Sequence, residues 1–169
     1  DGFDDLHDAT GILAEAEARA ARLYGAEETF FLVNGSTAGV LAAVSAVCGE
    51  AAARRTADGK ASPALLAGRA SHQSLYHAAY LNRAKLRYLQ EETLTEGAAR
   101  ITGAVSPGAV LEELERAAAE GRLPDAVFVT GPTYYGVVAD VASIVEIAHA
   151  HHVPVIVDEA HGAHFGFGH

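Results

Sequence analysis

A short polar run between an apolar segment and a helical pattern offers the first chemistry in the sequence. Asn34, Gly35, Ser36 and Thr37 follow the run TFFLV at residues 29–33. Glycine permits a tight turn, and the free N–H groups at a helix N-terminus, together with two hydroxyls, can bind a phosphate. No lysine follows the glycine, so the run is not a P-loop. The alternative is an ordinary turn followed by a capped helix.

A carboxylate follows the apolar run at residues 155–157. Asp158, Glu159, Ala160 and His161 form the string DEAH. In helicases this string holds magnesium, but that function requires an upstream phosphate loop with lysine and basic contacts to nucleic acid, and the sequence has neither. An aspartate at a strand end can instead pair with a protonated ring nitrogen of a ligand. The remaining alternative is an aspartate that caps the following loop.

Histidines near that aspartate raise the alternative of a metal centre. His161, His164 and His169 accompany Asp158 and Glu159, and such residues are good ligands for zinc or iron. Their spacing would suit a metal only in a helical segment, which the intervening glycines disfavour. We therefore predict no metal, and we interpret His164 and His169 as loop histidines that bond to backbone or water.

His72 opens a predicted helix elsewhere in the chain. An imidazole in that place could stack on an aromatic ligand or transfer protons. A lone histidine is more often structural, so this prediction depends on the neighbours of His72. Tyr134 and Tyr135 form either a packed loop pair or one wall of a ligand site.

The elements that must position these residues alternate along the chain. Apolar runs rich in β-branched or aromatic residues predict strands, and helical spacing of apolar residues predicts helices. Ser106 and Pro107 mark one helix start, as a cap and a first-turn proline. The range 50–62 is typical of a surface loop or an insertion, and 91–105 has no clear pattern. Strands are predicted at residues 29–33, 64–67, 86–89, 126–130 and 153–157, and helices at 11–24, 36–48, 71–81, 106–120 and 141–151.

This alternation of strands and helices indicates an α/β fold, in which a mostly parallel sheet lies between two layers of helices. Ligands of such sheets bind beyond the carboxyl ends of the strands. The runs 34–37, 71–72 and 131–133, and also Asp158, each follow a predicted strand. We therefore expect four separate loops to converge on one edge of the sheet.

Composition excludes several classes of function. The formal net charge is −10, which argues against a nucleic-acid partner or an anionic membrane surface, and agrees only weakly with a cationic substrate. Cys48 is the one cysteine, so the chain has no internal disulfide and no cysteine-based zinc site. No signal peptide and no apolar stretch of membrane-spanning length is evident, and we expect a cytoplasmic protein. The chain begins without methionine, and we expect it to be a fragment.

Four segments, in this order, resemble the large domain of the ornithine/lysine/arginine decarboxylases. They are FFLVNGSTAG, ASHQSLYHA, VTGPTYYGV and VPVIVDEAHGAHFGFGH, and the opening at residues 4–30 resembles the lead-in of the same family. The resemblance covers most of the chain except about 51–62 and 91–103. It implies a three-layer αβα, PLP-dependent (pyridoxal-phosphate-dependent) transferase-like large domain of the aspartate-aminotransferase fold, fold type I. Residues 1–169 would be part of it, with its remainder and a C-terminal domain outside this sequence.

The resemblance also implies roles for the residues that bind the phosphate of PLP. Ser36 and Thr37, with the turn at Gly35, would hold that phosphate. Thr133 would line the site. Gln73 stands where relatives usually carry lysine, a departure that concerns only the rim of the site.

Four further residues are assigned to the ring of PLP by the same resemblance. His72 would stack over the pyridine ring, and Ala160 would pack on its other face. Asp158 would pair with the ring nitrogen and keep it protonated, so that the ring accepts electrons. His161 would lie near the phenolic oxygen. His72, Asp158 and His161 are therefore the predicted catalytic residues within this chain.

The lysine that binds the cofactor covalently is missing from these 169 residues. Lys60 and Lys85 are the only lysines, and neither lies in the Ser-x-His-Lys setting that the family uses. That motif is expected beyond His169. A relative that has lost the lysine and its catalysis is the alternative.

The function implied is decarboxylation of a basic amino acid (arginine, lysine or ornithine) by a PLP enzyme that makes an amine of the polyamine pathway. The expected partners are the amino-acid substrate and further copies of the chain, in a homodimer or larger homo-oligomer. The alternatives are another fold type I PLP enzyme, such as an aminotransferase or a lyase, and a non-catalytic relative of the fold. A motor of the DEAH type is a third class, which nucleotide binding would reveal.

Overall fold

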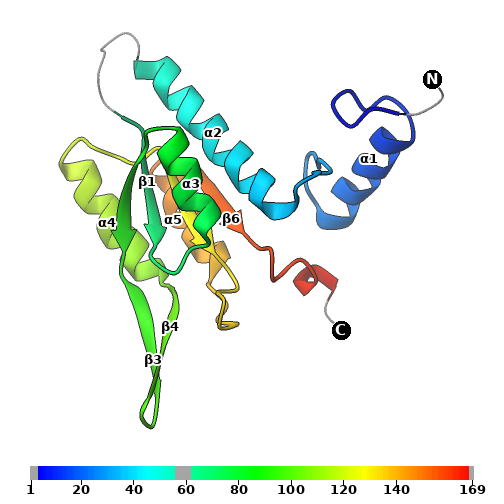
Figure 1. Ribbon diagram of the computed structural model, residues 1–169. Coiled ribbons are helices and arrows are strands. Elements are labelled where there is room, and N and C mark those ends of the chain that lie inside the picture. The colour runs from blue at the N-terminus through cyan, green and yellow to red at the C-terminus, as the bar shows by residue number, and fades with distance from the viewer. Residues whose placement is uncertain (1–3, 56–61, 168–169) are drawn as a thin grey trace.

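A four-stranded parallel sheet forms the centre of the protein (Figure 1). A computed structural model describes residues 4–55 and 62–167. The strand order is β2-β1-β5-β6, and all three neighbouring pairs are parallel. The strands are β1 (Ala64–Gly68), β2 (Lys85–Leu89), β5 (Ala126–Thr130) and β6 (Val155–Asp158).

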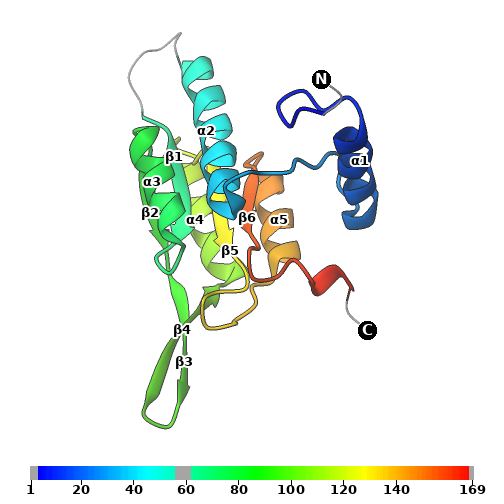
Figure 2. The same ribbon diagram turned by 45° about the vertical axis from the view of Figure 1, so that its right-hand side comes forward.

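Helices cover both faces of this sheet, which confirms the predicted three-layer α/β architecture (Figures 1 and 2). The first helical layer contains α2 (Gly35–Arg55) and α3 (Gln73–Leu81), and the second contains α4 (Pro107–Ala119) and α5 (Val141–Ala150). The central strands β1 and β5 are buried on both faces, so their sequences are apolar runs, whereas the edge strand β2 alternates with the charged residues Lys85 and Arg87.

Successive side chains of β1 enter two different cores. Leu65 packs with Val44 of α2 and Leu75 of α3, whereas Leu66 packs with Leu114 of α4 in the other layer. These side chains are fully buried. The period-two geometry of a strand therefore divides one apolar run between two cores and holds the helices in place on both sides.

The predicted strand at residues 29–33 is wrong. This segment is extended but has no strand partner among the described residues. Instead, the hydroxyl of Thr29 and the backbone N–H of Phe31 donate to Glu17 of α1 (Ile12–Tyr24), at 2.5 and 3.0 Å. An apolar, β-branched run forms a strand only when a neighbouring strand accepts its backbone hydrogen bonds.

Helix α2 is longer than predicted, since it continues into the expected loop at 50–62 as far as Arg55. Residues 56–61 of that loop lie outside the described residues. By length and composition alone, the window Gly35–Arg54 could cross a membrane, so the expectation that no stretch reaches that length is also wrong. One stripe of α2, which includes Val44 and Cys48, packs on the sheet and α3. Helices that pack in a protein core also meet the criteria of length and composition for a membrane span.

The unassigned range 91–105 is a β-hairpin. Strands β3 (Glu91–Glu96) and β4 (Ala99–Val105) pair in antiparallel fashion and project away from the main sheet (Figure 1). Ala104 and Val105 return to the core and are buried. The expected start of the next helix is confirmed, because the Ser106 hydroxyl accepts the N–H of Ala109 at 3.3 Å.

Helix α1 lies apart from the three layers, beside the C-terminal segment (Figure 2). The hydroxyl of Tyr24 donates to the carbonyl of Ala163 at 3.2 Å. The Tyr24 ring meets that of Phe167, in the short helix η1 (Phe165–Phe167), edge to face at 5.1 Å. This contact joins the two ends of the described chain.

Candidate active site

A cavity of about 450 Å³ lies beyond the carboxyl ends of β1, β5 and β6. Its lining includes Ser36 at the start of α2, His72 after β1, Tyr134 after β5 and Asp158 at the end of β6. Four separate segments therefore meet at one edge of the sheet, although no strand precedes α2 and Tyr134, rather than residues 131–133, represents the loop after β5. Parallel strands bring these segments together because all their carboxyl ends point the same way.

Asp158 is held at the rim of the core. Its side chain is buried, and β-sheet register places it beside Thr130 of β5. The backbone N–H of Ala160 donates to Oδ1 of Asp158 at 3.3 Å, and this is the only hydrogen bond to the carboxylate among the described residues. The other oxygen of this largely desolvated group is available for a donor in the cavity, such as a protonated ring nitrogen.

His72 is the cap of α3 and precedes its first turn, whereas the sequence predicted that it lies within that turn. Its Nδ1 accepts the backbone N–H of Ser74 at 3.2 Å and lies 2.9 Å from the Ser74 hydroxyl. Because Nδ1 acts as an acceptor there, a neutral ring carries its proton on Nε2. Ser74 is buried, so these two bonds orient an otherwise exposed imidazole that lines the cavity.

The start of α2 supplies one residue to the cavity wall. Ser36 lines the cavity, and the neighbouring Gly35 begins the helix with a φ of 63°, a left-handed conformation that favours glycine. Thr37 is exposed and lies outside the lining. Free N–H groups of the first helical turn lie at this end of α2, which gives the wall a partial positive charge that favours anions.

Thr133 does not line the main cavity, contrary to the prediction. It is buried, its hydroxyl accepts the N–H of Val137 at 3.2 Å, and it borders a void of about 10 Å³ beneath the site. Thr130 takes the place that the sequence assigned to Thr133, because it lines both the cavity and the void. The Thr130 hydroxyl is buried and has no hydrogen-bond partner among the described atoms.

The residues after Asp158 divide between the cavity and the surface. Ala160 and His161 line the cavity. His164 is instead stacked edge to face on Phe165 at 4.8 Å, and His169 lies outside the described residues. In residues 4–55 and 62–167, no group of three His, Cys, Asp or Glu side chains is arranged to hold a metal ion.

Glu91, at the base of the hairpin, supports the loop that carries His72, and the sequence did not reveal it. Its Oε1 accepts the backbone N–H of Ala70 at 2.8 Å. Only a glycine leaves room for this carboxylate at position 68, because a Cβ on Gly68 would clash with Oε1 of Glu91. The Ser71 hydroxyl donates to the Gly68 carbonyl at 2.8 Å and closes the turn.

The same loop has a second support from α3. The hydroxyl of Tyr76 donates to the carbonyl of Arg69 at 2.6 Å, and the Arg69 guanidinium lies 4.1 Å above the ring of Tyr88. Burial, followed by the nearby Tyr88 and Glu91, raises the pKa of Tyr76, so its hydroxyl keeps the proton that it donates. The His72 loop is thus supported from both sides.

Lys85, the one lysine among the described residues, does not line the site. Lys85 begins β2 at the opposite edge of the sheet, and it borders a different cavity. Lys60 lies outside the described residues.

Comparison with known proteins decides the family. The model of the Orn/Lys/Arg decarboxylase major domain matches residues 1–169. The chain belongs to the Orn/Lys/Arg decarboxylase family. This result confirms the resemblance that the four motifs carried.

Curated relatives align with nearly all of this chain. YaaO of Bacillus subtilis strain 168, described as uncharacterized, is 40% identical over 169 residues, and the arginine decarboxylase of that strain is 37% identical over 165 residues. The alignments cover 99% and 98% of this chain but 31% and 30% of those proteins. The chain therefore spans about a third of the length of these relatives.

Solved structures confirm the expected fold. The crystal structure of mouse CSAD matches with a TM-score of 0.67 at 18% identity, over 91% of this chain and 33% of that one. Rice (Oryza sativa) TDC, solved with PLP and tryptamine, matches with a TM-score of 0.65 at 20% identity, over 86% and 32%. The α/β domain of this decarboxylase-family chain is thus part of a PLP-dependent, fold type I architecture.

Proposed function

We propose that the complete protein carrying this domain is a PLP-dependent decarboxylase of a basic amino acid. One observation carries the proposal: Asp158, His72 and the start of α2 line a single cavity at the carboxyl edge of the sheet, in a chain of the Orn/Lys/Arg decarboxylase family. Each of the three supplies a different kind of contact, and PLP needs all of them.

The chemistry of the cavity fits PLP, the cofactor that the family and the PLP-bound rice structure indicate. Ser36 and the free N–H groups of α2 would hold the phosphate. His72 and Ala160 would enclose the ring from its two faces, and Asp158 would meet its nitrogen. A buried carboxylate that accepts only one described hydrogen bond suits a cationic N–H donor.

When bound, PLP supplies an electron-accepting ring that takes up the electron pair left behind as carbon dioxide departs. Asp158 would keep the ring nitrogen protonated, because an opposite charge at close range favours the charged form. The N–H of Ala160 holds the carboxylate in one orientation. His72 and His161 border the space where substrate would bind and can exchange protons there.

Arginine is the first substrate to test. Two Bacillus relatives named arginine decarboxylase are 37% and 32% identical to this chain. Lysine and ornithine complete the proposed range, and the amine product would belong to the polyamine pathway.

The proposal extends to the whole protein. Residues 1–169 would form part of its PLP-binding large domain, and the catalytic lysine would lie in the remainder. We propose a cytoplasmic homodimer or larger homo-oligomer. Exposed apolar side chains at Phe30 and Val33, directly before the Ser36 turn, are consistent with subunit contact beside the site.

The test is to incubate the full-length, PLP-loaded protein with arginine, lysine and ornithine, and to measure carbon dioxide and keto acid. Carbon dioxide from at least one of them supports the proposal. Keto acid with a 2-oxo acid acceptor, and no carbon dioxide, would identify an aminotransferase instead. Failure of a folded, PLP-loaded protein to form either product would contradict the proposed function.

A further inference from the structure

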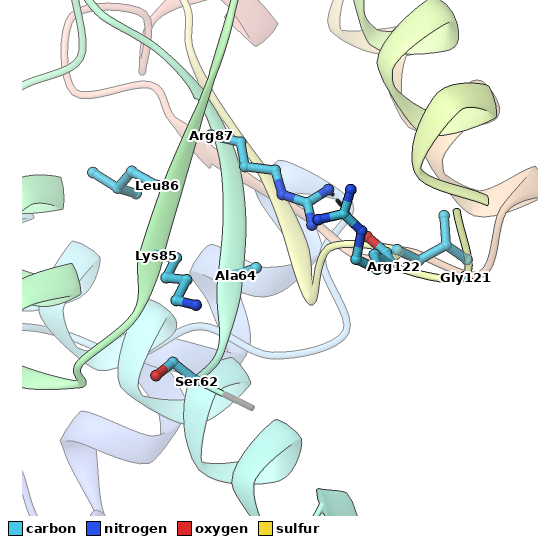
Figure 3. Close-up of a pocket in the computed structure, with 8 residues that line it drawn as sticks. Ser62, Ala64, Lys85, Leu86, Arg87, Gly121 and Arg122 are labelled. Carbon is cyan, nitrogen blue, oxygen red and sulfur yellow. Dashed lines mark hydrogen bonds between the residues drawn. The ribbon is translucent and has the colours of Figure 1, made fainter. Parts of the chain in front are cut away.

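A second cavity, of about 660 Å³, lies at the amino edge of the same sheet (Figure 3). The charged residues of its lining are all cations: Lys85 and Arg87 from β2, and Arg122 from the turn after α4. Ser62 adds a hydroxyl to the lining, and Leu123 adds an apolar side chain. A cavity with only positive charges is unexpected in a chain whose formal net charge is −10.

The fold itself directs these cations to one place. Lys85 and Arg87 are two residues apart on β2, so both side chains lie on the same face of the sheet. The turn after α4 brings Arg122 to them, because Gly121 adopts a φ of 63° and the Arg122 N–H donates to the Ala117 carbonyl at 2.8 Å.

Arg87 and Arg122 are also directly linked. Nη1 of Arg87 donates to the backbone carbonyl of Arg122 at 3.1 Å, and both residues border the cavity (Figure 3). This bond restrains Arg87 without neutralising it, since a carbonyl carries no net charge. Cations that border one cavity repel each other, and an anion bound there offsets that repulsion.

The nearby carboxylates offset only part of the charge, because Glu120 forms an ion pair with Arg122 but not with Lys85 or Arg87 among the described residues. Glu120 pairs with Arg122 and also with Arg116, whose Nη1 lies 3.3 Å from Glu120 Oε1. Asp125 is buried, and its carboxylate accepts the N–H of Ala64 at 2.8 Å. Within the described residues, neither Lys85 nor Arg87 has a carboxylate at ion-pair distance.

We propose that this cavity binds a small polyvalent anion that carries phosphate groups. Arginine guanidinium groups can donate paired N–H bonds to phosphate oxygens, the Lys85 ammonium adds a point charge, and Ser62 adds a hydroxyl donor. The volume suits a small metabolite. A nucleic acid is disfavoured, because beyond this cavity the negative net charge provides no extended basic surface.

This site is separate from the proposed PLP site. Ala64, at the amino end of β1, borders the new cavity, whereas Ala70 and Ser71, just after its carboxyl end, border the other one. The length of β1 therefore separates the two sites. The inference does not depend on the proposed decarboxylation.

The experiment uses full-length protein saturated with PLP, so that the cofactor site is already occupied. Tripolyphosphate is titrated by isothermal calorimetry at low ionic strength. We expect saturable binding, weakened about tenfold by Lys85→Gln and by Arg87→Gln, because each removes a charge-assisted contact. Arg100→Gln, on the exposed hairpin strand β4, removes the same charge far from the cavity and should leave binding nearly unchanged.

Three results would overturn the inference. One is the absence of saturable binding, and another is an equal loss in Arg100→Gln, which would mean a general charge effect. The third is tighter binding of citrate, which would contradict the phosphate preference. Lys85→Gln keeps the test decisive if Arg87→Gln misfolds, because the exposed Lys85 side chain makes no hydrogen bond in the described structure. Unchanged PLP absorbance and activity in that variant would separate this test from that of the proposed function.

Discussion

The two edges of the central sheet present opposite chemistry. The carboxyl edge combines a helix N-terminus with imidazoles and the buried carboxylate of Asp158, and it suits a ligand with both a phosphate and a cationic ring. The amino edge combines Lys85, Arg87 and Arg122, and it suits an anion alone. Both edges belong to the same strands, only a few residues apart along β1.

The difference lies in how each site is built. Most residues of the carboxyl edge lie at or soon after the end of a strand, and two of them are held by local bonds: His72 by Ser74 and Asp158 by Ala160. The amino edge depends on a strand meeting a turn from a distant part of the chain, through the Arg87 to Arg122 bond. A local motif marks the first kind of site, whereas only the assembled fold produces the second.

Asp158→Ala should impair the site at the carboxyl edge and leave the site at the amino edge intact, which is the largest contrast that we expect. In the full-length enzyme, we expect decarboxylation to fall about a hundredfold or more, because a preorganised charge beside the reacting system is lost. Asp158→Glu should retain some activity. Turnover with saturating PLP is the measurement, and tripolyphosphate binding at the amino edge should not change. Near-normal turnover of a folded Asp158→Ala protein would refute the role of Asp158.

Glu91→Ala tests whether the hairpin supports the carboxyl edge. Loss of the bond to the Ala70 N–H should loosen the His72 loop and weaken PLP binding about tenfold, the cost of one hydrogen bond to a charged acceptor. Glu91→Gln retains an acceptor oxygen and should recover most of the affinity. Fluorescence titration with PLP measures the change.

The matched control for Glu91 is its neighbour. Glu92 is exposed and forms no side-chain hydrogen bond among the described residues, so Glu92→Ala should bind PLP normally. Equal losses in the Glu91→Ala and Glu92→Ala proteins would exclude a specific contact to the loop.

Substitution of Asp4 should have a smaller effect, on the stability of the fold, because Asp4 lines neither cavity. Its carboxylate accepts backbone N–H groups at the start of α1, from Leu13 at 2.7 Å and from Thr10 at 3.1 Å. The bonds from Thr10 and Leu13 lower the pKa of Asp4 below its ordinary value. Such a group stabilises the fold above its unfolded-state pKa, and the contribution is lost as pH falls through the folded-state value.

Thermal unfolding at several pH values tests this cap. At neutral pH, Asp4→Asn should melt below the wild type, and the gap should narrow as the solution is acidified below about pH 4. Asp8→Asn serves as the control, because Asp8 is exposed and its side chain makes no described hydrogen bond. A gap for Asp4→Asn that is independent of pH would contradict an ionised cap.

Lys85 should not react with PLP bound at the carboxyl edge. A protein limited to residues 1–169, treated with PLP and borohydride, should carry no specific label on Lys85, because this residue lies across the sheet from the site. Peptide mapping after reduction is the measurement. Specific labelling of Lys60 or Lys85, with native-like absorbance, would contradict the assignment of the catalytic lysine to another part of the protein.

Much of the core was determined by the sequence alone. The predicted strands at 64–67, 86–89 and 126–130 match β1, β2 and β5 to within a residue, and the predicted cap at Ser106 is observed. These features depend on local properties: apolar runs, capping hydroxyls and fixed periodicity. The convergence of the loops on one edge followed from parallel strand direction, which the alternation of elements already implied.

Contacts between distant segments were decided only by the tertiary structure. The run at 29–33 has strand-forming residues but no strand partner, and the range 91–105 forms a hairpin without a sequence pattern that predicts it. Glu91 meets Ala70 and Arg87 meets Arg122 across 21 and 35 residues of sequence. Periodicity assigns a residue to an element and a face, but the partner that a side chain reaches depends on how those elements pack.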